Sequence, residues 1–126
     1  LDFEGGRFNI LFGCDEMLLG ALALGVTGAV GSTYNYCAPM YYEMIKAFRA
    51  GQLDTARALQ LKSVKLVEVL VVFGVLPSGK ALMSLKGVDC GPVRAPLRNL
   101  TAEQRSRLLH QVKSLNLIAP VQAAAH

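Results

Sequence analysis

Residues 8–35, FNILFGCDEMLLGALALGVTGAVGSTYN, decide the fold of this chain. In order, they read as an apolar strand, an acidic turn, an apolar helix, a second apolar strand and a turn rich in glycine, serine and threonine. That order predicts a βαβ unit, in which a right-handed helical crossover joins two adjacent parallel strands, at 8–12 and 28–31. Because parallel strands end at the same edge of a sheet, the polar residues that follow each strand should form one cluster.

The acidic turn after the first strand contains Gly13, Cys14, Asp15 and Glu16. Asp15 is suited to cap the next helix, because a carboxylate accepts hydrogen bonds from the free N–H groups of a first turn and matches its positive dipole end. That helix, at 17–24, carries no charge. We therefore expect it to be buried on all sides and to end at Gly25.

Beyond residue 35 the pattern predicts two helices in close succession. Pro39 suits the first turn of a helix that runs to about Ala50 and ends at Gly51. Asp54 or a neighbour should cap a long second helix that stops at Gly74. The last turns of this helix, at 69–73, are apolar all round, so something should cover them.

Two shorter helices and a loop complete the chain. Pro77 and Ser78 should open a helix to Gly87, and an extended loop is expected at 88–99. Thr101 and Gln104 form a capping box that opens the last helix. The stripe of that helix that should be buried is Leu108, Leu109, Val112 and Leu115. The tail at 120–126 should fray.

The composition is apolar for a chain of 126 residues, with 52% hydrophobic residues, 17% charged residues and a mean hydropathy of +0.37. Burial of that much apolar surface requires further strands or other subunits. The first residue is Leu1 rather than methionine, and we expect the sequence to be a piece of a longer chain.

Several classes of function are disfavoured by the same composition. The net charge of +4 comes mainly from basic residues spaced along the C-terminal part, without interleaved aromatics, which indicates a solvated face rather than a nucleic-acid surface. Glycines and Pro39 interrupt the uncharged stretch at 17–42, so no apolar run reaches the ~20 residues of a membrane-spanning helix. Cys14, Cys37 and Cys90 are odd in number and lack C-x-x-C spacing, so we expect reduced thiols and neither a disulfide framework nor a metal site.

Two motifs at the strand ends carry a resemblance to a known family. Gly13, Asp15 and Glu16 form G-x-D-E after the first strand, and residues 31–35 read GSTYN after the second. Together they resemble the seventh and eighth βα units of the N-acetylneuraminate lyases, or sialic acid aldolases, which are pyruvate-dependent class I aldolases. Residues 87–97 are similar to the G…GP-x-R-x-PL segment of the wider dihydrodipicolinate synthase superfamily. The resemblance extends from about residue 8 to about residue 117.

The resemblance implies an α/β fold that is the C-terminal part of a (β/α)₈ barrel, which needs roughly 250 residues in full. Residues 1–52 would hold strands and helices seven and eight, and residues 53–126 a helical C-terminal extension. It also implies a cytoplasmic homotetramer without a cofactor, acting on N-acetylneuraminate, N-acetylmannosamine and pyruvate, with no nucleic-acid or membrane partner.

The chemistry of this family requires a lysine that forms a Schiff base with the keto acid, and such a lysine needs a desolvated place at a strand end. None of the six lysines of this chain follows a strand, and the family's tyrosine does not match Tyr34, Tyr36, Tyr41 or Tyr42. Both catalytic residues are therefore expected upstream of Leu1, which leaves none in this chain.

The resemblance assigns this chain to sugar recognition. The Gly13 carbonyl, the side chains of Asp15 and Glu16, and the Ser32 hydroxyl would bind the hydroxyl groups of the sugar, since they supply the acceptors and donors that a polyhydroxylated tail requires. Leu76 would line the same pocket. The alternative for Asp15 is a helix cap, and for Ser32 a turn residue. His110 lies within a helix, where packing or exposure is favoured over catalysis.

Three other functions stay open. One is a dihydrodipicolinate-synthase-like or other 2-keto acid aldolase, which Glu16 and GSTYN disfavour. A second is a truncated, non-catalytic isoform that only oligomerises. A phosphate-binding loop at Gly25, Gly28 and Gly31 is a weak third, because these glycines enclose a strand instead of following one. The intact mass of the natural polypeptide would show whether the missing strands exist.

Overall fold

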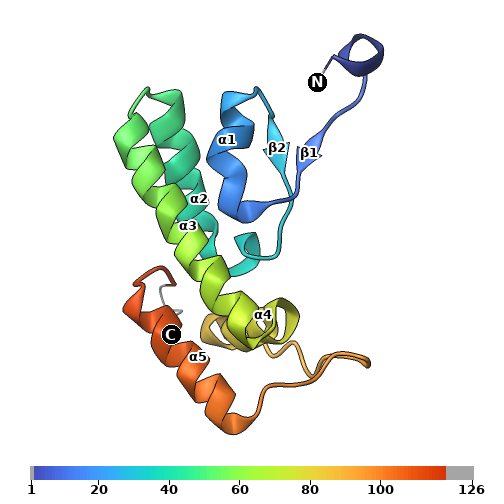
Figure 1. Ribbon diagram of the computed structural model, residues 1–126, viewed down its shortest axis with the longest axis vertical. Coiled ribbons are helices and arrows are strands. Elements are labelled where there is room, and N and C mark those ends of the chain that lie inside the picture. Colours follow the sequence, from blue (N-terminus) through green and yellow to red (C-terminus); the bar gives the residue numbers. More distant parts are fainter. Residues whose placement is uncertain (1, 119–126) are drawn as a thin grey trace, which may run out of the picture.

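The computed structural model describes residues 2–118, which form a short parallel strand pair flanked on one side by helices (Figure 1). The predicted fraying of the tail at 120–126 concerns residues outside this range. The elements are η1 (Phe3–Gly6), β1 (Leu11–Phe12), η2 (Asp15–Met17), α1 (Leu18–Ala23), β2 (Gly28–Ala29), α2 (Tyr34–Arg49), α3 (Leu53–Phe73), α4 (Val75–Met83), η3 (Ser84–Lys86) and α5 (Ala102–Ser114). Here η marks a short 3₁₀ turn.

The two strands are adjacent and parallel, as the βαβ pattern predicts. Leu11 lies opposite Gly28 and Phe12 opposite Ala29. The Val30 N–H extends the pairing by donating to the Phe12 carbonyl at 2.9 Å. Both strands are shorter than the predicted ranges 8–12 and 28–31. In the described part of the chain each strand has only the other as a neighbour, and an isolated strand pair is marginally stable.

Helix α1 is covered on one side only, so the prediction of complete burial is wrong for the described structure. Leu18 and Ala21 are buried against α2 and α3, whereas Met17 and Leu24 are 61% and 78% exposed. Gly25 ends the helix as predicted, with a φ of +88° that suits glycine. A side chain from α3 caps the start of α1, because the Leu19 N–H donates to Gln60 Oε1 at 2.7 Å.

Helix α2 begins at Tyr34, earlier than the start predicted at Pro39. The turn before the proline is helical but distorted, with Cys37 at φ −124° and ψ +18°. A proline inside a helix removes one N–H and displaces the preceding turn, which accounts for a kink at this place. Gly51, at φ +72°, follows the end of α2 as predicted.

The remaining boundaries agree with the glycine and capping signals, with two corrections. Asp54 does not cap α3 but pairs with Arg57 at 3.2 Å, and no side chain bonds to the helix start from the capping position Gln52. Helix α4 starts at Val75 instead of Pro77, directly after Gly74. The predicted capping box at α5 is confirmed, because Thr101 Oγ1 accepts from the Gln104 N–H at 3.1 Å and Gln104 Oε1 accepts from the Thr101 N–H at 2.9 Å.

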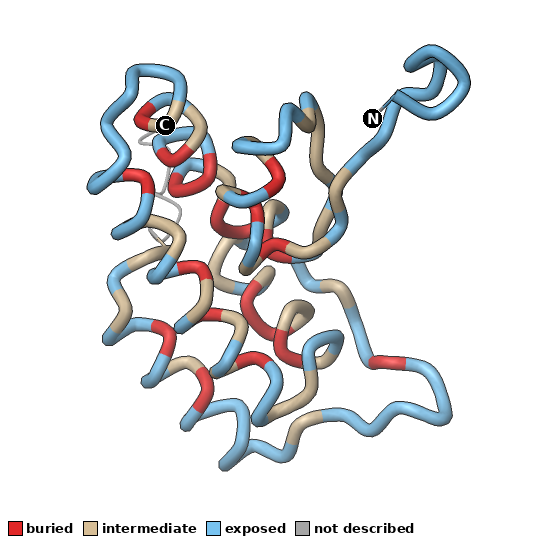
Figure 2. Tube along the Cα trace, turned by 45° about the horizontal axis from the view of Figure 1, so that its top comes forward, coloured by how far each residue is buried: buried red, intermediate tan, exposed pale blue. Residues whose placement is uncertain are grey.

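The core lies between the helices. Helices α2 and α3 run side by side, with α1 and the strands toward one end of this pair and α4 and α5 toward the other (Figure 1). Buried residues follow the inner faces of the helices, while the N-terminal segment and most of the loop at 88–99 are exposed (Figure 2). The fully buried large side chains are Leu18, Met44, Leu66, Leu70, Leu82, Leu108 and Val112.

Two apolar regions are left uncovered by the described residues. On the strands and the segments beside them, Phe8, Leu11 and Val30 are 45%, 53% and 61% exposed. At the end of α3, Leu70 is buried and Val69 and Phe73 are half-buried, but Val71 and Val72 are exposed, so residues 2–118 cover the turns at 69–73 only in part. Among residues 2–118, no single helix is long and apolar enough to cross a membrane. The segments Leu53–Phe73 and Val75–Lys86, which meet at an angle of 110°, are long and apolar enough only when they are taken together.

Candidate functional site

The carboxyl ends of β1 and β2 meet at a cavity of about 240 Å³. The four residues predicted to bind the sugar hydroxyls, Gly13, Asp15, Glu16 and Ser32, line this cavity, whereas Leu76, which was predicted to line the same pocket, lines a neighbouring cavity. Gly31 and Thr33 complete the polar side, and Val67, Leu70, Val71 and Val75 form an apolar wall. Parallel strand ends therefore bring the predicted residues together, while α3 supplies a wall that the sequence pattern did not indicate. We call this cavity the strand-end cavity.

Asp15 is buried, with 6% of its surface exposed, and it does not cap a helix. Its Oδ2 accepts two hydrogen bonds from Thr33, one from the backbone N–H at 3.0 Å and one from Oγ1 at 2.5 Å. The carboxylate thus ties the turn after β1 to the turn after β2. The capping interpretation of Asp15 is wrong because the second strand end offers donors to a buried carboxylate, and charge-assisted bonds of this kind are strong.

The close approach of Asp15 explains why position 31 is glycine. A β-carbon added at Gly31 would lie 1.7 Å from Asp15 Oδ1, so any side chain there would displace the carboxylate or the turn. Asp15 Oδ1 itself is buried and has no hydrogen-bond partner among the described residues. The cavity therefore contains one carboxylate oxygen that holds the scaffold and one that is left without a donor.

A buried hydroxyl network continues from Asp15 into the helices. Thr33 Oγ1 lies 2.7 Å from Tyr41 Oη, and Tyr41 Oη lies 2.8 Å from Ser63 Oγ. The Ser63 hydroxyl donates to the Asp15 carbonyl at 3.1 Å. Burial raises the pKa of Tyr41, so its hydroxyl stays protonated at neutral pH. The network fixes both strand ends to α2 and α3 and makes the position of the cavity rigid.

The sequence pattern missed the roles of Tyr41 and Ser63. Ser63 occupies a place on the inner face of α3, which the structure forms from Ala56, Ser63, Leu66 and Leu70, while Val64 and Val67 are only half-buried. A hydroxyl on an otherwise apolar face was the available signal, because a buried hydroxyl needs a partner. Tyr41 gave no such signal, since tyrosines occur on both buried and exposed faces.

Glu16 and Ser32 are the more accessible of the polar residues. Glu16 is half-buried and Ser32 is exposed, so both can reach a ligand in the cavity. Burial raises the pKa of the neighbouring Cys14 thiol, and the carboxylates of Glu16 and Asp15 raise it further. Cys14 is therefore a protonated thiol and a poor nucleophile at neutral pH. The site can bind hydroxyl groups but contains no activated nucleophile among these residues.

None of the lysines of residues 2–118 directly follows β1 or β2, although Lys80 lines a cavity that Ser32 also lines. Lys46, Lys62, Lys65 and Lys113 are exposed on helices. The Lys80 ammonium donates to the carbonyls of Cys90 at 2.7 Å and Pro92 at 2.9 Å, which holds the loop after η3. Lys86 is the last residue of η3. The same residues contain no group of histidine, cysteine and carboxylate side chains that could bind a metal ion. His110 is exposed on α5, as expected.

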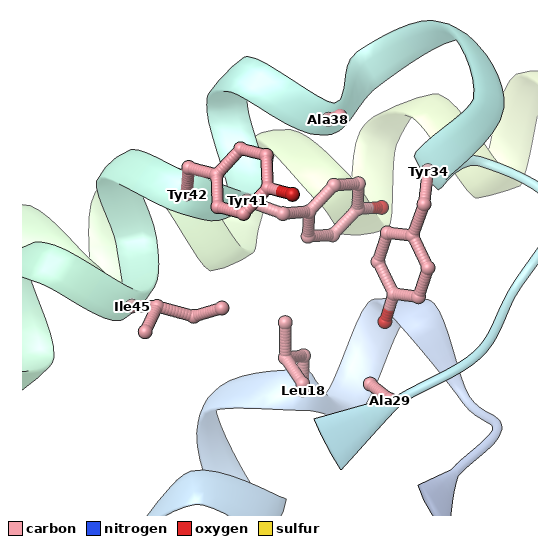
Figure 3. Close-up of a pocket in the computed structure, with 7 residues that line it drawn as sticks. All are labelled: Leu18, Ala29, Tyr34, Ala38, Tyr41, Tyr42 and Ile45. Carbon is pink, nitrogen blue, oxygen red and sulfur yellow. The ribbon is translucent and has the colours of Figure 1, made fainter. Parts of the chain in front are cut away.

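A second cavity, of about 270 Å³, lies between α1, β2 and α2 (Figure 3). The Tyr34 side chain points toward Leu18 and Ala29 and packs edge to face on Tyr41, with ring centroids 4.5 Å apart (Figure 3). Burial, and then the nearby Asp15, raise the pKa of Tyr34, so its hydroxyl stays neutral. This cavity is lined by apolar and tyrosine side chains without a carboxylate or an amine, and it marks a loosely packed junction of strand and helices.

Comparison with known proteins links this geometry to aldolases. The sequence model of the Dihydrodipicolinate synthetase family matches residues 4–115. The N-acetylneuraminate lyase of Rattus norvegicus is 39% identical over 115 residues, covering 90% of this chain and 36% of the relative. The N-acetylneuraminate lyase of Lactiplantibacillus plantarum is 45% identical over 97 residues, which cover 77% of this chain and 33% of that relative. The solved structure of Proteus mirabilis N-acetylneuraminate lyase superposes with a TM-score of 0.90 at 43% identity, covering 94% of this chain and 40% of that one.

These matches confirm the resemblance that the G-x-D-E and GSTYN motifs indicate. The solved structures that resemble the chain are (β/α)₈-barrel aldolases, and the described residues form a mostly helical part of such a fold. The chain spans about a third of the length of the curated relatives that it matches, 36% for the rat enzyme.

Proposed function

The chain belongs to the Dihydrodipicolinate synthetase family, and from this premise we propose that it is part of a sialic acid lyase. The complete protein would cleave N-acetylneuraminate to N-acetylmannosamine and pyruvate. The observation that carries the proposal is the strand-end cavity, where Gly13, Asp15, Glu16 and Ser32 come together. The similarity to N-acetylneuraminate lyases of rat, Lactiplantibacillus plantarum and Proteus mirabilis supports the choice of sialic acid as substrate.

We assign β1 and β2 to the seventh and eighth strands of the barrel. Residues 1–52 then belong to the barrel, and residues 53–126 form a helical extension that packs on it. The parallel pairing of the strands supports this assignment, as do the exposed apolar side chains of Phe8, Leu11 and Val30, which further strands would cover.

In the proposed mechanism, the bond-breaking residues lie outside this chain. A lysine amine would attack the keto carbon of N-acetylneuraminate, lose water to form an iminium, and let the iminium take the electron pair when the carbon–carbon bond breaks. The position of the six lysines, none of which follows β1 or β2, supports a nucleophile elsewhere. The 126 residues alone would then be inactive. We also propose a cytoplasmic homotetramer that needs no cofactor.

The role of this chain would be to hold the sugar. Glu16 would accept hydrogen bonds from sugar hydroxyls, and Ser32 would donate and accept. The Gly13 carbonyl would accept from another hydroxyl. Asp15 would keep Thr33 in place through Oδ2 and offer Oδ1 to the substrate, because Oδ1 lacks a donor among the described residues.

Two alternatives are consistent with membership of the family. The protein could be an aldolase for another 2-keto acid, or a truncated isoform without catalytic activity. Pyruvate release from N-acetylneuraminate separates the proposal from both, since another aldolase would prefer a different substrate and an isoform would release nothing.

The test uses the natural protein that contains this sequence. Glu16→Gln and Ser32→Ala should each lower kcat/KM for N-acetylneuraminate cleavage roughly ten- to a hundred-fold, which corresponds to ~1 to 3 kcal/mol for an unpaired substrate hydroxyl. Pyruvate should still form its iminium in both variants, because other groups bind it. Glu43→Gln, an exposed glutamate on α2, is the matched control and should leave the kinetics unchanged. Loss of iminium formation in folded Glu16→Gln would assign Glu16 to bond breaking instead.

A further inference from the structure

A third cavity adjoins the strand-end cavity. It has a volume of about 410 Å³, and Ser32 and Val75 line both cavities. Its other lining residues are Asn35, Tyr36, Leu76, Gly79, Lys80, Met83 and Cys90. The walls are mainly apolar, so this space suits a different part of a ligand from the hydroxyl groups that the strand-end cavity would bind. We call it the side groove.

Tyr36 brings an unused hydrogen-bond donor to the side groove. It is only 3% exposed, and its hydroxyl makes no hydrogen bond of good geometry among the described residues, although a weaker interaction with the Ser32 side chain opposes part of the rise in its pKa. Burial raises the pKa of Tyr36, so the hydroxyl keeps its proton at neutral pH. A buried hydroxyl without a partner costs free energy, and a ligand acceptor in the groove would recover it.

Lys80, the cationic residue that lines the side groove, already has two hydrogen-bond acceptors. The Lys80 ammonium donates to the carbonyls of Cys90 and Pro92, so its charge is directed to the loop at 88–99. Val75, Leu76 and Met83 offer apolar contacts. Because these contacts are apolar and Tyr36 supplies one donor, a group with one acceptor and a small apolar end fits the groove better than another hydroxyl chain.

We propose that the side groove binds the acylamino group of the sugar. The amide carbonyl would accept a hydrogen bond from Tyr36 Oη, and the methyl group would lie against Val75, Leu76 and Met83. This inference rests on the proposed function and assigns to Tyr36 a part in substrate specificity. Ser32, which lines both cavities, marks the point where the hydroxyl-bearing and acylamino-bearing parts of the sugar separate.

The test compares two sugars on the natural protein loaded with pyruvate. N-acetylmannosamine carries the acylamino group, and mannose carries a hydroxyl in its place. Tyr36→Phe should weaken N-acetylmannosamine binding about three- to ten-fold, the loss expected for one neutral hydrogen bond, and leave mannose binding unchanged. Cys90→Phe narrows the groove from the loop side, so it should also weaken N-acetylmannosamine binding more than mannose binding. Tyr42→Phe, a 71% exposed tyrosine on the same helix, is the control and should change neither affinity.

The possible results distinguish the acylamino assignment from the lyase proposal. Weaker binding of N-acetylmannosamine alone supports the inference. If the wild-type protein binds the sugars but Tyr36→Phe and Cys90→Phe change both affinities equally or neither, the acylamino assignment is overturned and the lyase proposal stands. If the wild-type protein binds neither sugar and releases no pyruvate from N-acetylneuraminate, the proposed function fails and this inference fails with it.

Discussion

At the scale of single residues, Asp15 and Thr33 determine how the two strand ends are joined. Thr33 gives Asp15 Oδ2 both of its hydrogen bonds and also lies within hydrogen-bonding distance of Tyr41. Thr33→Val keeps the shape of the side chain and removes the hydroxyl. We expect it to lower the free energy of unfolding by ~1 to 3 kcal/mol, because Asp15 loses a buried donor. Urea unfolding measures the change.

The matched control for that variant is Thr55→Val, since Thr55 is exposed in the first turn of α3. It should change the unfolding midpoint little, because surface substitutions usually have small effects. Equal midpoints for Thr33→Val and wild type would mean that the hydroxyl network does not stabilise the strand ends.

The burial of Cys37 should be measurable in solution, through the pH dependence of stability and the rate of thiol labelling. It is fully buried, and burial raises the pKa of its thiol to about 12, although Lys86 acts in the opposite direction. Because the folded protein binds this proton more tightly than the unfolded chain, stability should fall as the pH rises from 9.0 toward about 12. At neutral pH, iodoacetamide should label the half-buried Cys90, should label Cys14 more slowly because its thiol pKa is raised, and should label Cys37 only after unfolding.

Peptide mass spectrometry after timed labelling measures the three rates. Labelling of Cys37 as fast as Cys90 in the folded protein would contradict the burial of the first turns of α2.

At the scale of elements, the turn after β2 depends on a glycine for packing rather than for an unusual backbone angle. Gly31→Ala places a β-carbon on the Asp15 carboxylate, so it should break the link between the strand ends and lower the melting temperature strongly. Gly20→Ala in α1 meets no atom within 4 Å and should be neutral or stabilising, by up to ~1 kcal/mol, because alanine is the better helix former. Thermal unfolding of the two variants side by side gives the comparison, and a larger loss for Gly20→Ala would contradict the packing at Gly31.

Helix ends that depend on local chemistry could be predicted from the sequence, whereas those that depend on distant partners could not. Gly25, Gly51 and Gly74 marked helix ends correctly, and the Thr101 capping box was found because all of its atoms lie within one turn. A helix cap was kept as the alternative for Asp15 because its partner Thr33 is remote in sequence. The actual cap of α1, Gln60, comes from α3 and leaves no local signal.

The same distinction applies to the candidate site. The sequence was enough to predict the proximity of Gly13, Asp15, Glu16 and Ser32, because parallel strands place their ends at one edge of the sheet. The apolar wall from α3 and the unpaired Tyr36 hydroxyl depend on how the helices pack, which periodicity alone does not determine. The start of α2 was missed because Pro39 outweighed the helical residues before it.

At the scale of the whole molecule, the described residues bring Gly13, Asp15, Glu16 and Ser32 together at one cavity, which we propose binds a sugar, and leave apolar strand surface uncovered. The chain spans 36% of the length of the rat lyase. Under our proposal, the rest of the natural protein supplies the remaining strands of the barrel. Our central claim follows: the complete protein is a sialic acid lyase in which this chain recognises the sugar and another segment forms the Schiff base.

The most direct test is borohydride trapping of pyruvate on the natural protein, followed by digestion and mass spectrometry to locate the modified lysine. We predict one pyruvate-modified lysine, outside these 126 residues, with Lys46, Lys62, Lys65, Lys80, Lys86 and Lys113 unmodified. A modified residue among these six lysines, or no trapped adduct on the active natural protein, would contradict the account.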